Sequence, residues 1–401
     1  MAEIVVIGGG QAGASLVARL RERGFEGGIT LICGEDVPPY QRPPLSKAYL
    51  LGEMEEARLY LRPESYYADK NIALRLGAPV SAVDRAAKTV AVGDSILPYD
   101  HLALTTGSLP RRLPASIGGT LKGVHEVRSL RDVDAMRPAF GPGKRALIVG
   151  GGYIGLEAAA VATRLGVAVT LVEMARRILQ RVAAPETSDY FRALHVAHGV
   201  DIREGLGLER LSGGGHVTGA RFSDGTEIEV DFAIIGVGIT PDTALAQAAG
   251  VLVDNGIVVD GQGRTSDLSI WAAGDCATFP RGGRLIRLES VQNAIDQSEL
   301  VADNMLGAGR DYDPQPWFWS DQYDVKLQIA GLNTGYDRVV VRGGGASVSH
   351  WYYAGDTLLA VDAMNDPRNY MIGKRLIEAG KSPAPEMIKD PATDMKALLS
   401  N

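Results

Sequence analysis

The chain has 401 residues, of which 45% are hydrophobic and 22% are charged. This length predicts two or three domains, and the composition supports large buried cores and excludes a chain that is mainly disordered. The net charge of −7 argues against general nucleic-acid binding, although it leaves room for a local basic patch.

The sequence contains no recognisable targeting or membrane segment. The apolar run Ile4–Ile7 begins at once, without the basic region and cleavage site of a signal peptide, and no run of about 18 uncharged apolar residues follows anywhere. We therefore expect a cytoplasmic location and no membrane association. The two cysteines, Cys33 and Cys276, are too far apart in sequence for a CxxC motif or a zinc spacing, so no metal site is expected.

Two segments of the chain repeat one pattern, in which a buried strand leads through a glycine-rich turn into a helix and a second strand. The first predicted unit consists of strand Ile4–Ile7, a helix from Gln11 to about Arg23 and strand Ile29–Cys33. The second consists of strand Ala146–Val149, helix Tyr153–Leu165 and strand Ala168–Glu173. The pattern indicates a duplicated nucleotide-binding βαβ module of the α/β class.

The composition changes from about Pro314 onwards. An aromatic cluster, Trp317–Trp319, leads into the alternating segments Val339–Arg342 and Ser347–Tyr353, and a helical pattern follows around Met371–Ala379. This pattern predicts a smaller α+β domain at the C-terminal end.

Both glycine turns have the form G-x-G-x-x-G between a strand and a helix. The first glycine permits the tight turn, the second lets a pyrophosphate approach the backbone, and the third lets helix and strand pack closely. The helix N-terminus then offers free N–H groups to the phosphates. A glycine-rich turn without a ligand is the alternative for either copy, but two copies in matched contexts favour two nucleotide sites. The six glycines are Gly8, Gly10 and Gly13, and Gly150, Gly152 and Gly155.

Each module also has a carboxylate after its second strand, where dinucleotide-binding folds hold a ribose. Glu173 closes the strand of the second module and would repel the 2′-phosphate of NADPH, so it favours NADH. The neighbouring Arg176 and Arg177 leave some NADPH tolerance open. Glu35 is the candidate in the first module. The alternative for both glutamates is a solvated carboxylate at a strand end.

Four further motifs together show a family resemblance. The chain resembles the putidaredoxin reductase-like, NADH-dependent ferredoxin reductases of bacterial oxygenase systems, which are flavoproteins with two dinucleotide-binding domains. The motifs are RPPLSK at Arg42–Lys47, IWAAGDC at Ile270–Cys276, LESVQ at Leu288–Gln292 and FWSDQ at Phe318–Gln322.

The resemblance implies two Rossmann-like domains and a smaller C-terminal α+β domain. The FAD-binding domain would comprise residues 1–109 and 240–316, the NAD-binding domain residues 110–239, and the C-terminal reductase domain residues 317–401. It also implies the cofactor contacts. FAD would be bound by Ala12, Gly13, Arg42, Lys47, Val80, Thr106, Gly107, Arg128, Asp275 and Val291, and the second module would add Ile154 and Gly238. Asp242 stands where related chains often have asparagine, which puts an amide contact from that position in doubt.

Three residues are expected to act in catalysis. A cation at Lys47 would stabilise the negative charge that develops on the reduced flavin. The resemblance predicts an ion pair between Lys47 and Glu157 that bridges the FAD and NADH domains, and it places Trp319 near the flavin. The alternatives are a solvated lysine, a turn-forming aspartate at Asp275 and a core aromatic at Trp319.

The electron acceptor is expected outside the chain, because no cysteine pair is available for a disulfide relay. Cys33, at the end of an apolar strand, is expected to be buried packing. The resemblance implies a small acidic [2Fe–2S] ferredoxin as the partner, and the acid-free stretch that holds Arg281, Arg284 and Arg287 gives modest support. Two alternatives stay open: an NADH oxidase or quinone reductase on the same fold, and a non-enzymatic FAD- and NADH-binding redox-signalling module.

Overall fold

The computed structural model describes residues 2–400, which form two compact units. The first unit contains the chain up to Gln41, Glu55–Leu109 and Ile239–Pro316, and the second contains Arg42–Met54, Pro110–Gly238 and the chain from Trp317 onwards. The segment 42–54 was expected with the first nucleotide-binding module, and by its contacts it belongs to the second unit.

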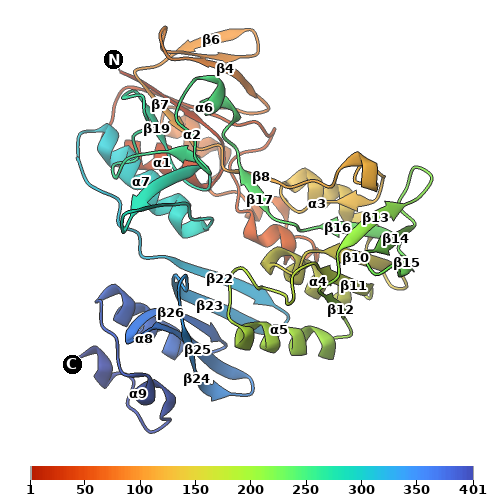
Figure 1. The fold of residues 1–401 in the computed structure, drawn as a ribbon. Coiled ribbons are helices and arrows are strands. Elements are labelled where there is room, and N and C mark those ends of the chain that lie inside the picture. The colour runs from red at the N-terminus through yellow and green to blue at the C-terminus, as the bar shows by residue number, and fades with distance from the viewer. Residues whose placement is uncertain (1, 401) are drawn as a thin grey trace. The chain divides into compact units, whose positions relative to one another are not determined.

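The first unit is built on a five-stranded parallel sheet with the strand order β19-β7-β1-β2-β3. Figure 1 labels β7 and β19 of this sheet. Its strands are β1 (Glu3–Ile7), β2 (Gly28–Ile32), β3 (Ile72–Arg75), β7 (His101–Leu104) and β19 (Ile270–Ala272). Helix α1 (Gln11–Glu22) follows β1 directly, and α7 (Val291–Met305) lies beside it. Strands β1 and β2 differ by one or two residues from the predicted bounds, and α1 ends one residue before its predicted end.

Alternating side chains give this sheet two separate cores. Val6 and Leu31 belong to a core that contains Leu16 of α1 and Val301 of α7. Residues of the opposite parity, such as Val5, belong to a second core on the other face. Because both faces are covered, the strands are almost continuously apolar, as parallel strands usually are.

Smaller elements complete the first unit. They are the sheet β4 (Val80–Asp84), β5 (Thr89–Val92) and β6 (Ser95–Pro98); the strands β18 (Ile257–Val258), β20 (Ala277–Arg281) and β21 (Arg284–Ile286); and the helices α2 (Glu64–Asp69) and α6 (Ala244–Ala248). Strand β8 (Ser108–Pro110) pairs with β17 (Ile239–Pro241).

The second unit repeats the parallel architecture with the strand order β12-β11-β10-β16-β9. Its strands are β9 (Val124–His125), β10 (Arg145–Val149), β11 (Ala168–Glu173), β12 (Asp201–Glu204) and β16 (Phe232–Ile235). The accompanying elements are α3 (Leu130–Met136), α4 (Tyr153–Arg164), α5 (Pro185–Ala197) and the small sheet β13 (Leu208–Ser212), β14 (Gly219–Phe222) and β15 (Glu227–Glu229). The predicted bounds of β11 agree with the structure, and those of β10 and α4 differ from it by one residue.

The same unit contains an antiparallel sheet with the order β22-β23-β26-β25-β24. Its strands are β22 (Trp317–Gln322), β23 (Val325–Gly331), β24 (Arg338–Gly344), β25 (Ser347–Ala354) and β26 (Thr357–Met364), and α8 (Pro367–Glu378) and α9 (Pro385–Lys389) pack with it. Helix α8 begins four residues before the predicted start, because the Asp366 side chain accepts a hydrogen bond from the Asn369 amide and caps it, with Pro367 as the first helical residue.

Among residues 2–400, no helix combines the length and the hydropathy that are needed to cross a membrane.

Candidate functional site

The first glycine turn joins β1 to α1 in the geometry that a phosphate cradle needs. Gly8 has a φ of +117°, and a Cβ added there would lie 2.2 Å from the Thr105 carbonyl oxygen. A Cβ on Gly13 would lie 2.1 Å from the Gly8 carbonyl oxygen, so helix and turn pack without room for a side chain. Gly10 differs, because nothing lies within 4 Å of its added Cβ. The middle glycine therefore leaves open space next to the backbone at the start of α1.

Two polar contacts lie near this turn in the first unit. The Thr106 hydroxyl donates to the Asp242 carbonyl oxygen over 2.5 Å, and the Asp242 amide donates to the Gly107 carbonyl. The backbone at Asp242 thus joins the loop after β7, whatever its side chain is. The Ser108 hydroxyl donates to the Asp275 Oδ2 atom over 3.0 Å, which fixes that carboxylate beyond the end of β19.

Helix α7 begins at Val291, and its N-terminus is capped by the Ser290 side chain, which accepts from the Asn293 amide. Further along this helix the Gln297 Oε1 atom accepts from the Gly274 amide over 2.9 Å. A Cβ on Gly274 would meet the Ala12 Cβ at 3.1 Å, so the loop before Asp275 lies against the start of α1.

The remaining predicted FAD residues are distributed over both units. Glu35 accepts from the Tyr40 hydroxyl over 2.7 Å, and Val80 is the half-buried first residue of β4. Arg42 and Arg128 belong to the second unit, where the Arg42 guanidinium donates to the Arg128 carbonyl oxygen over 2.7 Å. The structure thus brings Arg42 and Arg128 together.

The second glycine turn reproduces the geometry of the first. Gly150 has a φ of +108°, and its added Cβ would lie 2.3 Å from the Gly236 carbonyl oxygen. A Cβ on Gly155 would lie 2.1 Å from the Gly150 carbonyl oxygen, whereas nothing lies within 4 Å of an added Cβ on Gly152. The same close packing and the same open position therefore occur at the start of α4.

Glu173 is fixed next to this second turn. Its Oε2 atom accepts from the Gly151 amide over 2.8 Å, and its Oε1 atom accepts from the Ala175 amide over 2.7 Å. A carboxylate has about four acceptor positions, so two of them stay available. The Glu173 side chain is therefore held rigidly at the cradle and still has acceptor capacity for hydroxyl groups.

Two other predicted positions lie close to this cradle in sequence. Ile154, in the first turn of α4, is 45% exposed although its side chain is large and apolar. Gly238 has a φ of +101° and its carbonyl oxygen accepts from the Arg111 amide. The positive φ at Gly238 is a conformation that other residues adopt only at a cost.

The predicted ion pair between Lys47 and Glu157 is present. The Lys47 Nζ atom lies 2.7 Å from the Glu157 Oε2 atom, and the side chains are 19% and 5% exposed. Glu157 also accepts from the Ser46 hydroxyl over 2.6 Å and from the Ser320 hydroxyl over 2.7 Å. Both members of the pair belong to the second unit, because segment 42–54 packs there, so the pair does not bridge the two units as expected. Three donors and low exposure give a strong charge-assisted contact.

Trp319 lies on β22 within an aromatic group and is half-buried. Its ring centroid is 5.6 Å from that of Trp317 and 6.3 Å from that of Phe318, and Phe318 in turn lies 5.0 Å from the Tyr153 ring of α4. This group connects β22 to the start of α4, the helix that follows the second glycine turn.

Comparison with known proteins identifies the family. Residues 2–298 match the pyridine nucleotide-disulphide oxidoreductase family, and residues 317–399 match the reductase C-terminal family. The chain is 41% identical to rhodocoxin reductase of Rhodococcus erythropolis over 99% of its own length and 94% of the relative's. It is 40% identical to putidaredoxin reductase of Pseudomonas putida over 99% and 96% of the two lengths.

The chain belongs to the pyridine nucleotide-disulphide oxidoreductase family. Its fold agrees with this assignment. A chain of the crystal structure of the covalent putidaredoxin reductase–putidaredoxin complex superposes with a TM-score of 0.96 at 39% identity, covering 100% of this chain and 98% of that one. The predicted fold class, with two dinucleotide-binding modules and a C-terminal α+β part, is confirmed.

FAD and NADH are the cofactors of this oxidoreductase, and the two turns fit dinucleotides. Each turn presents one glycine with open space beside two glycines that are closely packed, as a pyrophosphate against the backbone requires. Each turn also leads into a helix whose first N–H groups and positive dipole end attract phosphate. At the second turn, Glu173 adds a carboxylate suited to the ribose hydroxyls of NADH.

The family name refers to a disulfide, but the two cysteines of this chain are buried single residues. Cys33 is 2% exposed and packs in the core of the first unit, as predicted, and burial raises the pKa of its thiol to about 12. Cys276 is fully buried, and burial also raises the pKa of its thiol. A thiolate, which is the reactive form, is therefore disfavoured at both positions.

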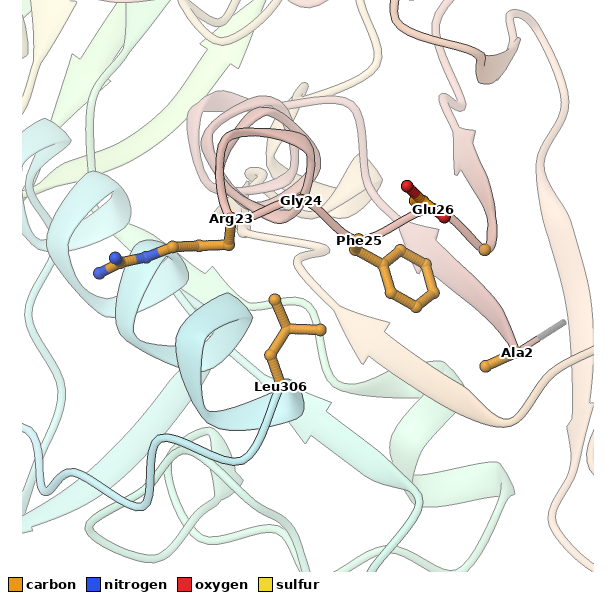
Figure 2. A pocket seen from close by; sticks show the side chains of 7 residues that line it. Ala2, Arg23, Gly24, Phe25, Glu26 and Leu306 are labelled. Carbon is orange, nitrogen blue, oxygen red and sulfur yellow. The ribbon is translucent and has the colours of Figure 1, made fainter.

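A shallow surface pocket of about 460 Å³ lies in the first unit, and Figure 2 shows the residues that line it. Arg23, Gly24 and Phe25, which follow the C-terminal end of α1, line it together with Leu306 after α7. Helix α1 spans 12 residues and is therefore about 18 Å long, and the pocket and the phosphate cradle lie at its opposite ends. The position of the pocket, at the opposite end of α1 from the glycine turn, does not suit a dinucleotide bound at that turn.

Ser46 and Ser320, which donate to Glu157, were not predicted from the sequence. Ser46 lies in RPPLSK and Ser320 in FWSDQ, two of the four motifs that carry the family resemblance, and this was the available signal. Their positions are separated by more than a hundred residues from Glu157 along the chain, so no local pattern could connect them with it.

Proposed function

We propose that this chain is a flavoprotein reductase that transfers electrons from NADH through FAD to a [2Fe–2S] ferredoxin, which feeds a monooxygenase or a dioxygenase. The observation that carries the proposal is the pair of matched glycine turns, each with its open middle position. Two dinucleotide sites in one chain allow NADH to be oxidised by FAD. Because the chain has no cysteine pair, the electrons then pass to an acceptor outside the chain.

FAD, when bound, supplies the conversion between a two-electron donor and a one-electron acceptor. The residues of the chain bind and orient the two dinucleotides. We assign Gly8, Gly10 and Gly13 to the FAD pyrophosphate, and Gly150, Gly152 and Gly155 to that of NADH. Glu35 and Glu173 are assigned to the two riboses, and Asp275, which Ser108 holds in place, to hydroxyl groups of FAD.

Lys47 is proposed as the cation that stabilises the negative charge of the reduced flavin, and Glu157 as the residue that holds Lys47. A fixed charge that needs no reorganisation during the reaction is an effective form of catalysis. The three donors to Glu157 keep its carboxylate in one orientation, which in turn fixes the Lys47 ammonium. Trp319 is proposed as an aromatic wall near the flavin.

The names of the relatives support a ferredoxin as the acceptor. One is the 5,5′-dehydrodivanillate O-demethylase ferredoxin reductase subunit of a Sphingobium strain, 42% identical over 99% of this chain. In the first unit Arg281 and Arg284 lie opposite each other on strands β20 and β21. Two positive charges are thereby concentrated on this hairpin, and they would attract an acidic partner.

Two basic residues of the C-terminal part give less support, because each has an acid beside it. Lys374 forms an ion pair with Glu378 over 2.9 Å, and Arg368 lies 3.9 Å from Asp394. The hairpin arginines are the better candidates for steering the ferredoxin.

Stopped-flow mixing with NADH, followed by a [2Fe–2S] ferredoxin, tests the proposal. We expect rapid bleaching of the flavin and then ferredoxin reduction whose rate falls as salt is added, because surface charges are screened. Fast turnover with oxygen or a quinone and slow turnover with ferredoxin would instead indicate the oxidase or quinone reductase. A long-lived reduced complex with negligible turnover would indicate a redox-signalling module.

A charge-reversal pair sharpens the assignment of the docking surface. Arg284→Glu is expected to slow ferredoxin reduction at low salt and to reduce its salt dependence, while flavin reduction by NADH is unchanged. Arg85→Glu, an exposed arginine elsewhere in the first unit, is the matched control and should affect neither rate. Equal effects of the two substitutions on the rate of ferredoxin reduction would show that the hairpin is not part of the docking surface.

The cytoplasmic location stays a prediction, and fractionation of cells that produce the chain tests it.

A further inference from the structure

A continuous series of hydrogen bonds in the second unit ends at Glu157. The Ser320 hydroxyl donates to the Glu157 Oε1 atom over 2.7 Å, and the Gln322 Nε2 atom donates to the Ser320 oxygen over 3.1 Å. The His195 Nε2 atom lies 2.8 Å from the Gln322 Oε1 atom, and the Tyr323 hydroxyl lies 3.3 Å from His195 Nδ1. Ser320, Gln322 and His195 are all fully buried.

The chemistry of these groups fixes the direction of the bonds from His195 through Gln322 and Ser320 to Glu157. A carboxylate can only accept, so the single Ser320 proton points to Glu157 and the Ser320 oxygen accepts from the Gln322 amide. The Gln322 oxygen then faces His195, which must carry its proton on Nε2 and can accept from Tyr323 on Nδ1. Burial lowers the pKa of His195 to about 4, so the ring is neutral near pH 7. The donors of His195, Gln322 and Ser320 therefore all point towards Glu157.

The outer end of the series is anchored at the surface. Tyr323 adopts a φ of +56°, which costs free energy in a residue other than glycine. Its ring stacks on His198 with centroids 3.7 Å apart, and its hydroxyl also lies 3.1 Å from the Thr163 hydroxyl of α4. These contacts hold Tyr323 in the strained turn and so hold the first member of the series.

An amide at the centre makes this a positioning device and not a proton path. Gln322 joins its neighbours through an N–H donor and a carbonyl acceptor, and passing a proton along would require an unfavourable amide tautomer. A fixed amide is suited to orienting the Ser320 hydroxyl, and bonds aligned in one direction polarise one another.

We propose that His195, Gln322 and Ser320 are positioning residues for the reduction of FAD by NADH, because they fix the Glu157 carboxylate that holds Lys47. The inference rests on the proposed function. Glu157 shares its Oε2 atom between Lys47 and Ser46, so Ser320 is the group that fixes the other oxygen and stops the carboxylate from rotating.

Two substitutions at His195 separate positioning from mere packing. His195→Leu removes the donor and is expected to lower the limiting rate of flavin reduction about 3- to 10-fold, since coupled hydrogen bonds typically interact by about 1 kcal/mol. The dissociation constant for NADH should stay within about twofold. His195→Gln places an amide nitrogen at the same distance along the side chain and should restore most of the rate. Gln322→Met repeats the loss if His195→Leu does not fold.

His350→Leu is the matched control, because His350 is also buried in the second unit but bonds to Thr187. It should leave the limiting rate unchanged even if it lowers stability. Equal rates for wild type and His195→Leu, or an equal loss in His350→Leu, would overturn the inference.

A readout without NADH tests the same series directly in the purified, oxidised protein. In ¹⁵N spectra, His195 should show the neutral tautomer with its proton on Nε2, and Ser320→Ala should shift that resonance more than it shifts any resonance of His350. The opposite tautomer would overturn the inference. If wild-type flavin is not reduced by NADH at all, the proposed function fails, while the spectra still report on the hydrogen bonds.

Discussion

Two alanine substitutions in the second glycine turn separate a packing role from a binding role. At Gly155 an added methyl group would lie 2.1 Å from the Gly150 carbonyl oxygen, whereas a Cβ normally stays beyond about 3.4 Å from backbone atoms. The backbone must therefore move by more than an ångström. Overpacking of this kind costs about 3 kcal/mol, which corresponds to a decrease in Tm of roughly 6–12 °C for a unit of this size.

At Gly152 the same change meets open space. The backbone there is extended, with φ −82° and ψ 178°, and nothing lies within 4 Å of the added methyl group. Gly152→Ala is therefore expected to keep or raise Tm, because alanine has less conformational freedom to lose on folding. The methyl group nevertheless occupies the space that the pyrophosphate needs, and NADH affinity should fall at least about tenfold, or ~1.4 kcal/mol.

The assay combines thermal unfolding with a titration of flavin reduction against NADH concentration. FAD content, measured after gel filtration, should be unchanged in Gly152→Ala, because FAD is assigned to the other turn. The matched substitution Gly10→Ala should show the reverse, with loss of FAD and an intact fold. Wild-type NADH affinity in Gly152→Ala, or a wild-type Tm in Gly155→Ala, would refute the geometric reasoning.

Four further outcomes are expected from the structure. Glu157→Gln should slow the limiting rate of flavin reduction and lower stability by about 3–5 kcal/mol, because Lys47 loses its buried partner; unchanged reduction kinetics with normal FAD content would contradict its role. His195, with a pKa of about 4 against 6.5 when unfolded, should make stability fall as pH decreases from 6.5 towards 4, by up to about 3 kcal/mol, and His195→Gln should remove this part of the acid sensitivity in urea titrations. Asp362 has the opposite effect on stability, because burial raises its pKa to about 6 and protonation of this residue therefore favours the folded state. Asp362→Asn should make the free energy of unfolding fall more steeply as the pH decreases. Both thiols should react with a thiol reagent only after unfolding, and rapid modification of the folded protein would show that the burial is wrong.

The sequence was sufficient for the parts of the fold that local patterns determine. The strand–glycine turn–helix order of both modules was predicted with bounds within about two residues, because buried strands and glycine turns are signalled by neighbouring residues. The start of α8 was predicted too late, because its apolar pattern begins near Met371 while the cap at Asp366 lies in a polar stretch. The membership of segment 42–54 could not be predicted, since it depends on contacts such as the hydrogen bond from Tyr49 to Asp134.

The candidate site divides in the same way. The glycines and Glu173 follow from spacing and chemistry alone, and the Lys47–Glu157 pair required the family resemblance. The hydrogen bonds that lead to Glu157 could be found only from the structure. Ser320 and His195, which take part in them, lie on elements more than a hundred residues apart in the chain. Hydrogen bonds between side chains on distant elements have no periodicity that a sequence can display.

The most direct test of the central claim is the visible spectrum of the purified protein before and after NADH is added without oxygen. We expect the absorption bands of oxidised flavin at about one FAD per chain, and bleaching of these bands on mixing with NADH. A colourless preparation that takes up no FAD, or a yellow one whose spectrum NADH does not change, would contradict it.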